Sequence, residues 1–128
     1  MKKIVIIGAN DFQNQLILKA KEMGFETHVF AWQDGSIGER TADHFYPVSI
    51  VEIDEILEKC REIKPDAVAT IASDLANITV SKVAAGLGLP GNTPECIELS
   101  TNKYAMRSAF LKAGLPTPKF YKVDRVIP

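Results

Sequence analysis

Two short polar segments contain the residue types best suited to binding a small molecule. The first is Gly8-Ala9-Asn10-Asp11 and the second is Ser73-Asp74, and each precedes a predicted helix. The partial positive charge at a helix N-terminus favours a carboxylate or a phosphate. Asp11 and Asp74 would offset that charge and favour an amine or a hydroxyl instead. We therefore predict that the substrate-binding residues are Gly8, Ala9, Asn10, Asp11, Ser73 and Asp74.

The same polar side chains also suit a purely structural role. Asn, Asp and Ser are the usual N-cap residues, because their short side chains accept a hydrogen bond from an unpaired amide in the first helical turn. Taken singly, Asn10, Asp11, Ser73 and Asp74 are explained about equally well by capping and by ligand binding. Both roles stay open at this point.

Lys103 is the sharpest candidate for an anion contact. It lies in the first turn of a predicted helix, where the macrodipole opposes a cation, so a bound anion would explain it better than helix stability does. Arg107 lies one turn later and could help to hold the same anion. The alternative is a solvated surface lysine, which by physics alone is the commoner case.

Two familiar nucleotide-binding motifs are absent from the sequence. A dinucleotide-binding loop needs small residues where the backbone approaches the pyrophosphate, but Asn10 and Gln13 stand at those positions after Gly8. The acid expected at the end of the second strand is also missing. No G-x-x-x-x-G-K-[ST] run occurs, which excludes a P-loop.

Histidine and cysteine chemistry has little support in the sequence. His28 alternates with Val29 in the second predicted strand and is better explained as an edge or packing histidine than as a catalyst. Neither His28 nor His44 has an evident nucleophile partner. Cys60 and Cys96 lie on separate predicted helices without a C-x-x-C pair, as expected for reduced thiols. We therefore predict no catalytic residue and no metal ligand in this chain.

The alternation of strands and helices predicts how the polar segments are positioned. The predicted strands are 4–7, 27–32, 44–48 and 67–72, and the main predicted helices are 12–23, 53–63 and 75–87. This order favours the α/β class, as a Rossmann-like open parallel sheet with helices on both faces. Ligands bind such sheets where the strand order reverses, here at the loops after the first and fourth strands.

Local patterns add detail to two of these helices. Ser49-x-x-Glu52 is a capping-box pattern, which predicts reciprocal capping at the start of helix 53–63. The apolar residues of helix 12–23 recur at helical spacing, and we expect all of them to pack against the sheet: Phe12, Leu16, Ile17, Ala20 and Met23.

The last third of the chain has a different character. Thr93-Pro94-Glu95 predicts a capped short helix to about Ser100, and Asn102 or Thr101 caps a further helix that stops at Gly114. Lys119–Val123 is a predicted final strand. We therefore expect a domain at 1–100, followed at 101–128 by a linker helix and the first strand of an absent second domain.

Composition limits the partners that this chain can have. It has 128 residues with 15 basic and 16 acidic side chains, for a net charge of -1, so no global attraction to nucleic acid or to an anionic membrane is expected. The apolar run before Gly8 is too short for a signal peptide or a membrane span. We expect a cytoplasmic protein with neither nucleic acid nor membrane as a partner.

Residues 3–123 resemble the N-terminal domain that precedes the ATP-grasp fold in biotin carboxylase, carbamoyl phosphate synthetase and the purine-pathway ATP-grasp ligases. The resemblance rests on the order of several motifs: strand-Gly8-x-x-x-x-Gln13, Ala42-Asp43-His44-Phe45-Tyr46-Pro47-Val48, Gly88-Leu89-Pro90-Gly91, Asn102-Lys103 and Ala113-Gly114-Leu115-Pro116-Thr117-Pro118. This chain departs from the family at Asn102, where an aspartate is common, and in having one glycine in the first loop.

The resemblance implies an ATP-dependent ligase, in which a carboxylate becomes an acyl phosphate that an amine or another nucleophile attacks. Lys103 then matches the basic residue that contacts nucleotide phosphate. The loops after the first and fourth predicted strands, Gly8 to Asp11 and Ser73-Asp74, match substrate-facing loops. ATP and Mg²⁺ would serve the full-length enzyme, whose own C-terminal ATP-grasp domain is the expected partner, together with a small-molecule substrate. The family also allows a homodimer, which no motif here specifies.

The chain by itself is not expected to catalyse or to bind ATP tightly. Phosphoryl transfer needs carboxylates for Mg²⁺ and several cations, and no such cluster follows Lys103. The alternative to a ligase domain is a stand-alone Rossmann-like module that binds a nucleotide or metabolite without catalysis. The two hypotheses differ at Thr101–Val123, which completes the core only in the second.

Overall fold

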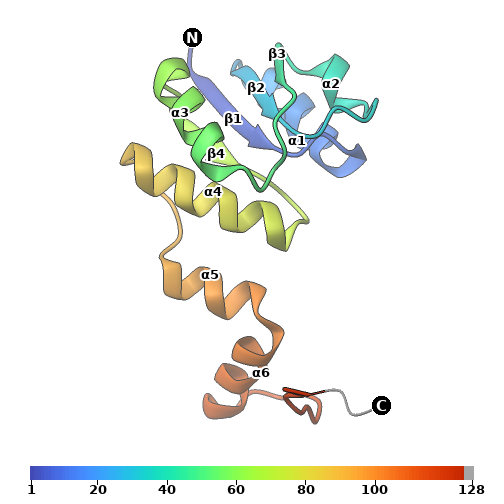
Figure 1. Ribbon diagram of the computed structural model, residues 1–128, viewed down its shortest axis with the longest axis vertical. Coiled ribbons are helices and arrows are strands. Elements are labelled where there is room, and N and C mark those ends of the chain that lie inside the picture. The colour runs from blue at the N-terminus through green and yellow to red at the C-terminus, as the bar shows by residue number, and fades with distance from the viewer. Residues whose placement is uncertain (126–128) are drawn as a thin grey trace. The chain divides into compact units, whose positions relative to one another are not determined.

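The computed structural model describes residues 1–125 and contains one parallel β-sheet in the order β3-β2-β1-β4 (Figure 1). The strands are β1 (Lys3–Ile7), β2 (Glu26–Phe30), β3 (His44–Tyr46) and β4 (Ala67–Ala69). The helices are α1 (Asp11–Glu22), α2 (Gly38–Thr41), α3 (Ile53–Ile63), α4 (Asp74–Leu87), α5 (Pro94–Thr101) and α6 (Lys103–Lys112). The predicted α/β class with an open parallel sheet is confirmed.

The central strand β1 is buried on both faces, as its run of β-branched residues predicts. Val5 and Ile7 contribute to one core cluster, together with residues of α3 and α4. Ile4 and Ile6 contribute to a second cluster, together with residues of α1. Alternate side chains of one strand thus attach helices to opposite faces of the sheet.

The strand order reverses beside β1. The chain moves outward from β1 through β2 to β3, and then returns to pair β4 with the other side of β1, with Ile6 opposite Ala69. The loops after β1 and β4 therefore leave the sheet next to each other. This is the arrangement in which open parallel sheets bind ligands.

The prediction for the buried face of α1 is wrong at both ends of the helix. Phe12 and Met23 are 65% and 64% exposed, whereas Gln13, Ile17 and Ala20 are buried. The inward position of Gln13 sets the rotation of the helix, because the neighbouring Phe12 then points about 100° away. A buried polar residue thus displaces an apolar one from the core face.

The predicted capping box at the start of α3 is also wrong. The helix begins at Ile53, and Glu52 is its N-cap without a side-chain capping bond. The Glu52 amide instead donates to the Ser49 carbonyl at 3.0 Å, so these residues form a turn before the helix. Ser49 therefore lies one turn too early to cap it.

The chain divides into two compact units, one comprising residues 1–92 and the other beginning at Thr93. In the second unit, Thr93 caps α5 and Pro94 occupies its first turn, as predicted. Asn102, rather than Thr101, caps α6, and its side-chain oxygen accepts bonds from the Tyr104 and Ala105 amides. The predicted domain limits at 100 and 101 stay a prediction.

The predicted strand at Lys119–Val123 does not form in the described part of the chain. A strand needs a partner to satisfy its backbone N–H and C=O groups. The described sheet contains only β1 to β4, so this segment has no ladder to join.

Candidate functional site

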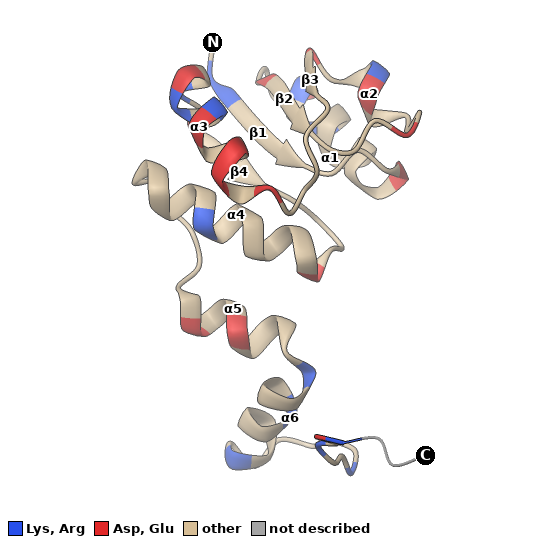
Figure 2. Cartoon of the chain, viewed as in Figure 1, with Lys and Arg blue, Asp and Glu red and all other residues tan. Residues whose placement is uncertain are grey.

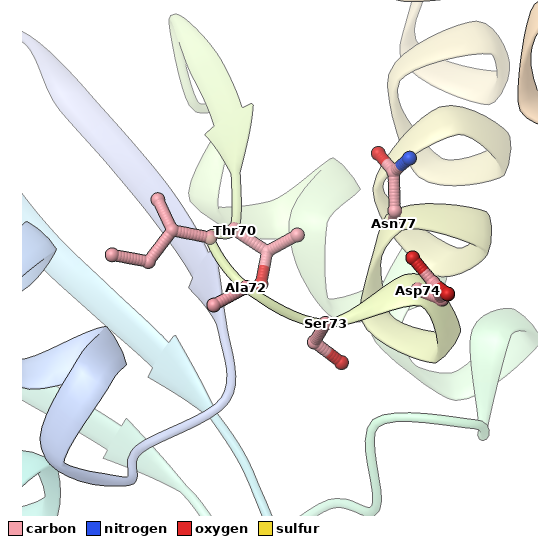
Figure 3. Close-up of a pocket in the computed structure, with 6 residues that line it drawn as sticks. Thr70, Ala72, Ser73, Asp74 and Asn77 are labelled. Carbon is pink, nitrogen blue, oxygen red and sulfur yellow. The ribbon is translucent and has the colours of Figure 1, made fainter. Parts of the chain in front are cut away.

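An open pocket of about 590 Å³ lies at the loop that connects β4 to α4 (Figure 3). This loop follows the strand next to β1, at the point where the strand order reverses. Its lining includes the predicted residues Ser73 and Asp74. The other lining residues, which the sequence analysis missed, are Thr70, Ile71, Ala72 and Asn77.

The side chain of Gln13 joins the β4–α4 loop to the beginning of α1. Its Nε2 donates to the Ile71 carbonyl at 2.5 Å, and its Oε1 accepts from the Ile71 amide at 3.2 Å. Gln13 is 2% exposed whereas Ile71 is 38% exposed, so the bonds are shielded from water on the glutamine side. One amide group therefore fixes the backbone of the pocket loop to the segment that follows β1.

Gly8 makes room for this bridge. Its φ of +106° is unfavourable for any residue with a Cβ, and a Cβ at this position would lie 2.8 Å from the Cγ of Gln13. The spacing Gly-x-x-x-x-Gln thus has a physical explanation, because the glycine lets the glutamine pass. Contact between Gly8 and a substrate stays a prediction.

Ala9 is buried and faces the core rather than the pocket. It belongs to the α1 core cluster, and its carbonyl accepts a bond from the Gly38 amide at 3.0 Å. A Cβ on Gly38 would lie 2.6 Å from that carbonyl oxygen. The first loop is therefore packed closely against α2.

Asn10 and Ser73 are the N-cap residues of α1 and α4, so both have the helix-capping role that the sequence analysis considered beside ligand binding. Asn10 Oδ1 accepts from the Gln13 amide, and Ser73 Oγ accepts from the Ala76 amide, both at 3.1 Å. Asp11 and Asp74 are instead exposed first residues of α1 and α4. Of the four polar side chains, Ser73 and Asp74 line the pocket in the described chain.

The pocket loop is held at several points along its backbone. Thr70 Oγ1 donates to the Ile7 carbonyl at 2.8 Å, which ties the loop to β1. Ala72 then adopts a left-handed conformation with φ of 52°. Such a conformation costs free energy for an alanine, and residues held this way are concentrated at binding sites.

Asp74 and Asn77 lie three residues apart on α4, and Figure 3 shows both side chains beside the pocket loop. Together they offer a carboxylate and an amide, while the first turn of α4 offers backbone N–H groups. The arrangement can bind a molecule that carries an amine or hydroxyl at one end and an anionic group at the other.

Comparison with known proteins identifies the fold. No protein-family model and no curated protein matches the chain by sequence. Among solved structures, phosphoribosylglycinamide synthetase from Anaerococcus prevotii matches 88% of this chain with 27% identity and a TM-score of 0.75. N5-carboxyaminoimidazole ribonucleotide synthetase from Thermotoga maritima matches 98% with 24% identity and a TM-score of 0.78, and L-amino acid ligase from Bacillus licheniformis matches 92% with 24% and 0.78.

These neighbours are ATP-grasp ligases. The chain has the fold of their N-terminal domain. It covers 29%, 34% and 32% of the three solved chains, which is about a third of their length. The resemblance predicted from the sequence motifs is therefore confirmed.

Lys103 belongs to the second unit of this ATP-grasp N-terminal fold. It is exposed and directly follows the Asn102 cap, so its predicted place in the first turn of a helix is confirmed. Charges differ between the two helices of this unit, since α5 carries only acidic and α6 only basic side chains (Figure 2). The contact of Lys103 with nucleotide phosphate stays a prediction.

The described residues contain no helix that is both long and apolar enough to cross a membrane.

Proposed function

We propose that this chain is the N-terminal, substrate-side domain of an ATP-dependent ligase. In the complete enzyme a carboxylate is activated as an acyl phosphate and then attacked by an amine or another nucleophile. The observation that carries this proposal is the Gln13 bridge to Ile71, which holds a polar pocket at the strand reversal of an ATP-grasp N-terminal fold. Gly8 to Asp11 and Ser73-Asp74 are the proposed substrate-facing segments.

The chemistry of the pocket suits part of such a substrate. Asp74 and Asn77 would hold an amine or hydroxyl, and the N-terminal amides of α4 would hold a carboxylate or phosphate. The names of the solved neighbours include a phosphoribosyl compound, a ribonucleotide and an L-amino acid. We therefore propose an amino acid or a phosphorylated ribose as the class of ligand.

The described residues fit only part of an ATP site. Lys103 and Arg107 are one turn apart on α6, so both could contact phosphate oxygens. Helix α6 carries no carboxylate that could hold Mg²⁺. In this proposal most contacts to ATP and Mg²⁺, which supply the phosphoryl group and neutralise its charge, come from the rest of the enzyme.

The second unit supports a ligase domain over a stand-alone module. The core clusters of the described chain draw their members from residues between Ile4 and Leu87. Helix α6 contains no buried residue, although it includes Met106 and Phe110. Both clusters thus belong to the first compact unit, and residues 101–125 are not among their members, as the ligase hypothesis expects.

The size of the native polypeptide tests this proposal. The 128 residues have a mass of 14.1 kDa, and an antibody raised against them would detect the native chain in a denaturing gel. A chain longer by on the order of 150 residues or more supports a ligase, and ATP-dependent phosphate release with candidate carboxylates would follow. A native chain of 14.1 kDa would overturn the proposal in favour of a stand-alone module.

A further inference from the structure

Three potential metal ligands lie together on strands β2 and β3, outside the pocket. Glu26 and His28 are two residues apart on β2 and therefore share a face of the sheet. His44 is the parallel-register partner of His28 on the edge strand β3. The ligand atoms of the three side chains lie within 4.8 Å of one another.

The distances within this cluster are close to those of a metal site. The Nε2 atoms of His28 and His44 each lie 3.0 Å from the same Oε1 of Glu26. Tetrahedral zinc, with bonds of about 2.0–2.2 Å to nitrogen and oxygen, separates its ligand atoms by about 3.4 Å. The two Nε2–Oε1 distances would need to lengthen by only a few tenths of an ångström to match this separation.

Tyr46 fixes one of the two imidazoles. Its hydroxyl lies 3.0 Å from Nδ1 of His28, and its ring stacks on the buried Phe30 with centroids 4.6 Å apart. His28 itself is 4% exposed. Hydrogen bonding at the second ring nitrogen is the usual way in which proteins orient a metal-binding histidine.

His44 supplies the freedom that metal binding requires. The two imidazole planes are 16° from parallel with centroids 4.5 Å apart, so their lone pairs do not yet point at one atom. His44 must turn for this to happen, and its side chain is half exposed. The same exposure opens a path for an ion from solvent.

We propose that Glu26, His28 and His44 bind a divalent transition-metal ion, with Zn²⁺ as the favoured species and water in the fourth position. Two imidazoles and a carboxylate suit zinc, whereas Mg²⁺ and Ca²⁺ prefer oxygen ligands alone. The site lies on β2 and β3 and does not depend on the proposed ligase function. Without a metal, Oε1 of Glu26 lies 3.0 Å from Nε2 of both histidines, so the carboxylate is the centre of the cluster.

Zinc binding to the 128-residue chain tests this assignment. The chain, freed of metal with a chelator, would be titrated with Zn²⁺ against a chromophoric competitor. A Cys96→Ser background removes the exposed thiol, while Cys60 is buried. We expect one Zn²⁺ per chain, and Co²⁺ should give the visible absorption of a four-coordinate site.

Variants assign the binding to these residues. His44→Ala and Glu26→Gln should lower the zinc affinity more than Tyr46→Phe, for which the loss of an outer-shell partner predicts about 10–100-fold. Glu22→Gln, at an exposed acid on α1, should leave the affinity unchanged. Circular dichroism would confirm that each variant is folded, and His44→Ala is expected to be so because His44 is exposed.

Two results would overturn the assignment. One is the absence of zinc binding at micromolar to millimolar Zn²⁺ by the folded chain. The other is zinc binding by folded His44→Ala or Glu26→Gln that is as tight as in the parent, since this would place the ion elsewhere.

Discussion

Thr27 and Asp43 hold each other through three hydrogen bonds. The amide and hydroxyl of Thr27 both donate to Asp43 Oδ2 at 2.9 Å, and the Asp43 amide lies 3.0 Å from Thr27 Oγ1. Thr27 is fully buried in β2, and Asp43 immediately precedes β3. This pair fixes the start of the edge strand.

Replacing Asp43 with alanine should therefore destabilise the fold. The buried donors of Thr27 would lose their acceptor, which predicts a decrease of about 1–3 kcal/mol in the free energy of unfolding in urea. Glu58→Ala, which removes an exposed partner of Arg61, is the control and should change stability by less than about 1 kcal/mol. Equal effects of the two substitutions would contradict the prediction.

The Asp43 contribution should also depend on pH. The bond from the Thr27 backbone, helped by Lys21 and the Thr27 hydroxyl, lowers the pKa of Asp43 from 3.8 to about 2. A carboxyl whose pKa is lower in the folded state stabilises the fold above its ordinary pKa, and this stabilisation is lost as the pH falls through the folded value. The stability difference between the parent and Asp43→Asn should be constant above about pH 5 and shrink toward pH 2. Unfolding curves between pH 6 and 2 measure it, and a constant difference would argue against this role.

Removing the Gln13 side chain should release the pocket loop. Gln13→Ala leaves the N–H and C=O of Ile71 without their partner, which predicts a loss of about 1–3 kcal/mol and faster hydrogen exchange at the Ile71 amide. Gln15→Ala is a matched control, because Gln15 is exposed on the same helix. Unchanged exchange at Ile71 in Gln13→Ala would show that the bridge does not hold the loop.

Gly8→Ala should destabilise the fold by more than Gly24→Ala. Both glycines have positive φ, but a Cβ at Gly24 meets nothing within 4 Å, whereas a Cβ at Gly8 meets Gln13. Both substitutions should therefore carry a similar free-energy cost from the backbone conformation. The difference between their losses of stability then measures the clash with Gln13. The double variant Gly8→Ala with Gln13→Ala should lose less stability than the sum of the losses of the two single variants, because the clash is absent once Gln13 is truncated. Simple additivity would remove the steric explanation.

The two cysteines should react very differently with a thiol reagent. Burial raises the pKa of the Cys60 thiol to about 12, so at pH 8 it is protonated as well as inaccessible. Cys96 is exposed. We expect one thiol per native chain to react with a disulfide reagent and two in urea, with Cys96→Ser abolishing the native reaction. Rapid native labelling of that variant would contradict the burial of Cys60.

Ligand binding should map to the pocket loop. In NMR titrations of the 128-residue chain with glycine or ribose 5-phosphate, we expect the largest shifts at residues 70–77 and 8–11. Asn77→Ala should weaken binding, and Lys82→Ala, at an exposed site on the same helix, should not. Shifts that centre elsewhere would move the site away from this pocket.

The sequence was sufficient to predict the parallel sheet, because runs such as Ile4 to Ile7 combine high strand propensity with burial on both faces. It also identified the loops after β1 and β4, since that position follows from topology alone. The polar residues Thr70 and Asn77 were missed because each reads as an ordinary member of a strand or a helix.

Gln13 shows why such residues escape prediction. Its buried position depends on a partner, Ile71, that is distant in sequence, and no local pattern signals that contact. The same limit applies to Lys119–Val123, whose strand propensity has no effect without a neighbouring strand. His28 and His44 meet only because β2 and β3 pair in one register.

The two outer strands of the sheet, β3 and β4, are each only three residues long. A short edge presents few unpaired N–H and C=O groups to a strand from another molecule. The domain is therefore poorly suited to joining a second copy or an extended peptide by continuing its sheet. Any stable association that it forms is expected to use the surfaces of its helices and loops.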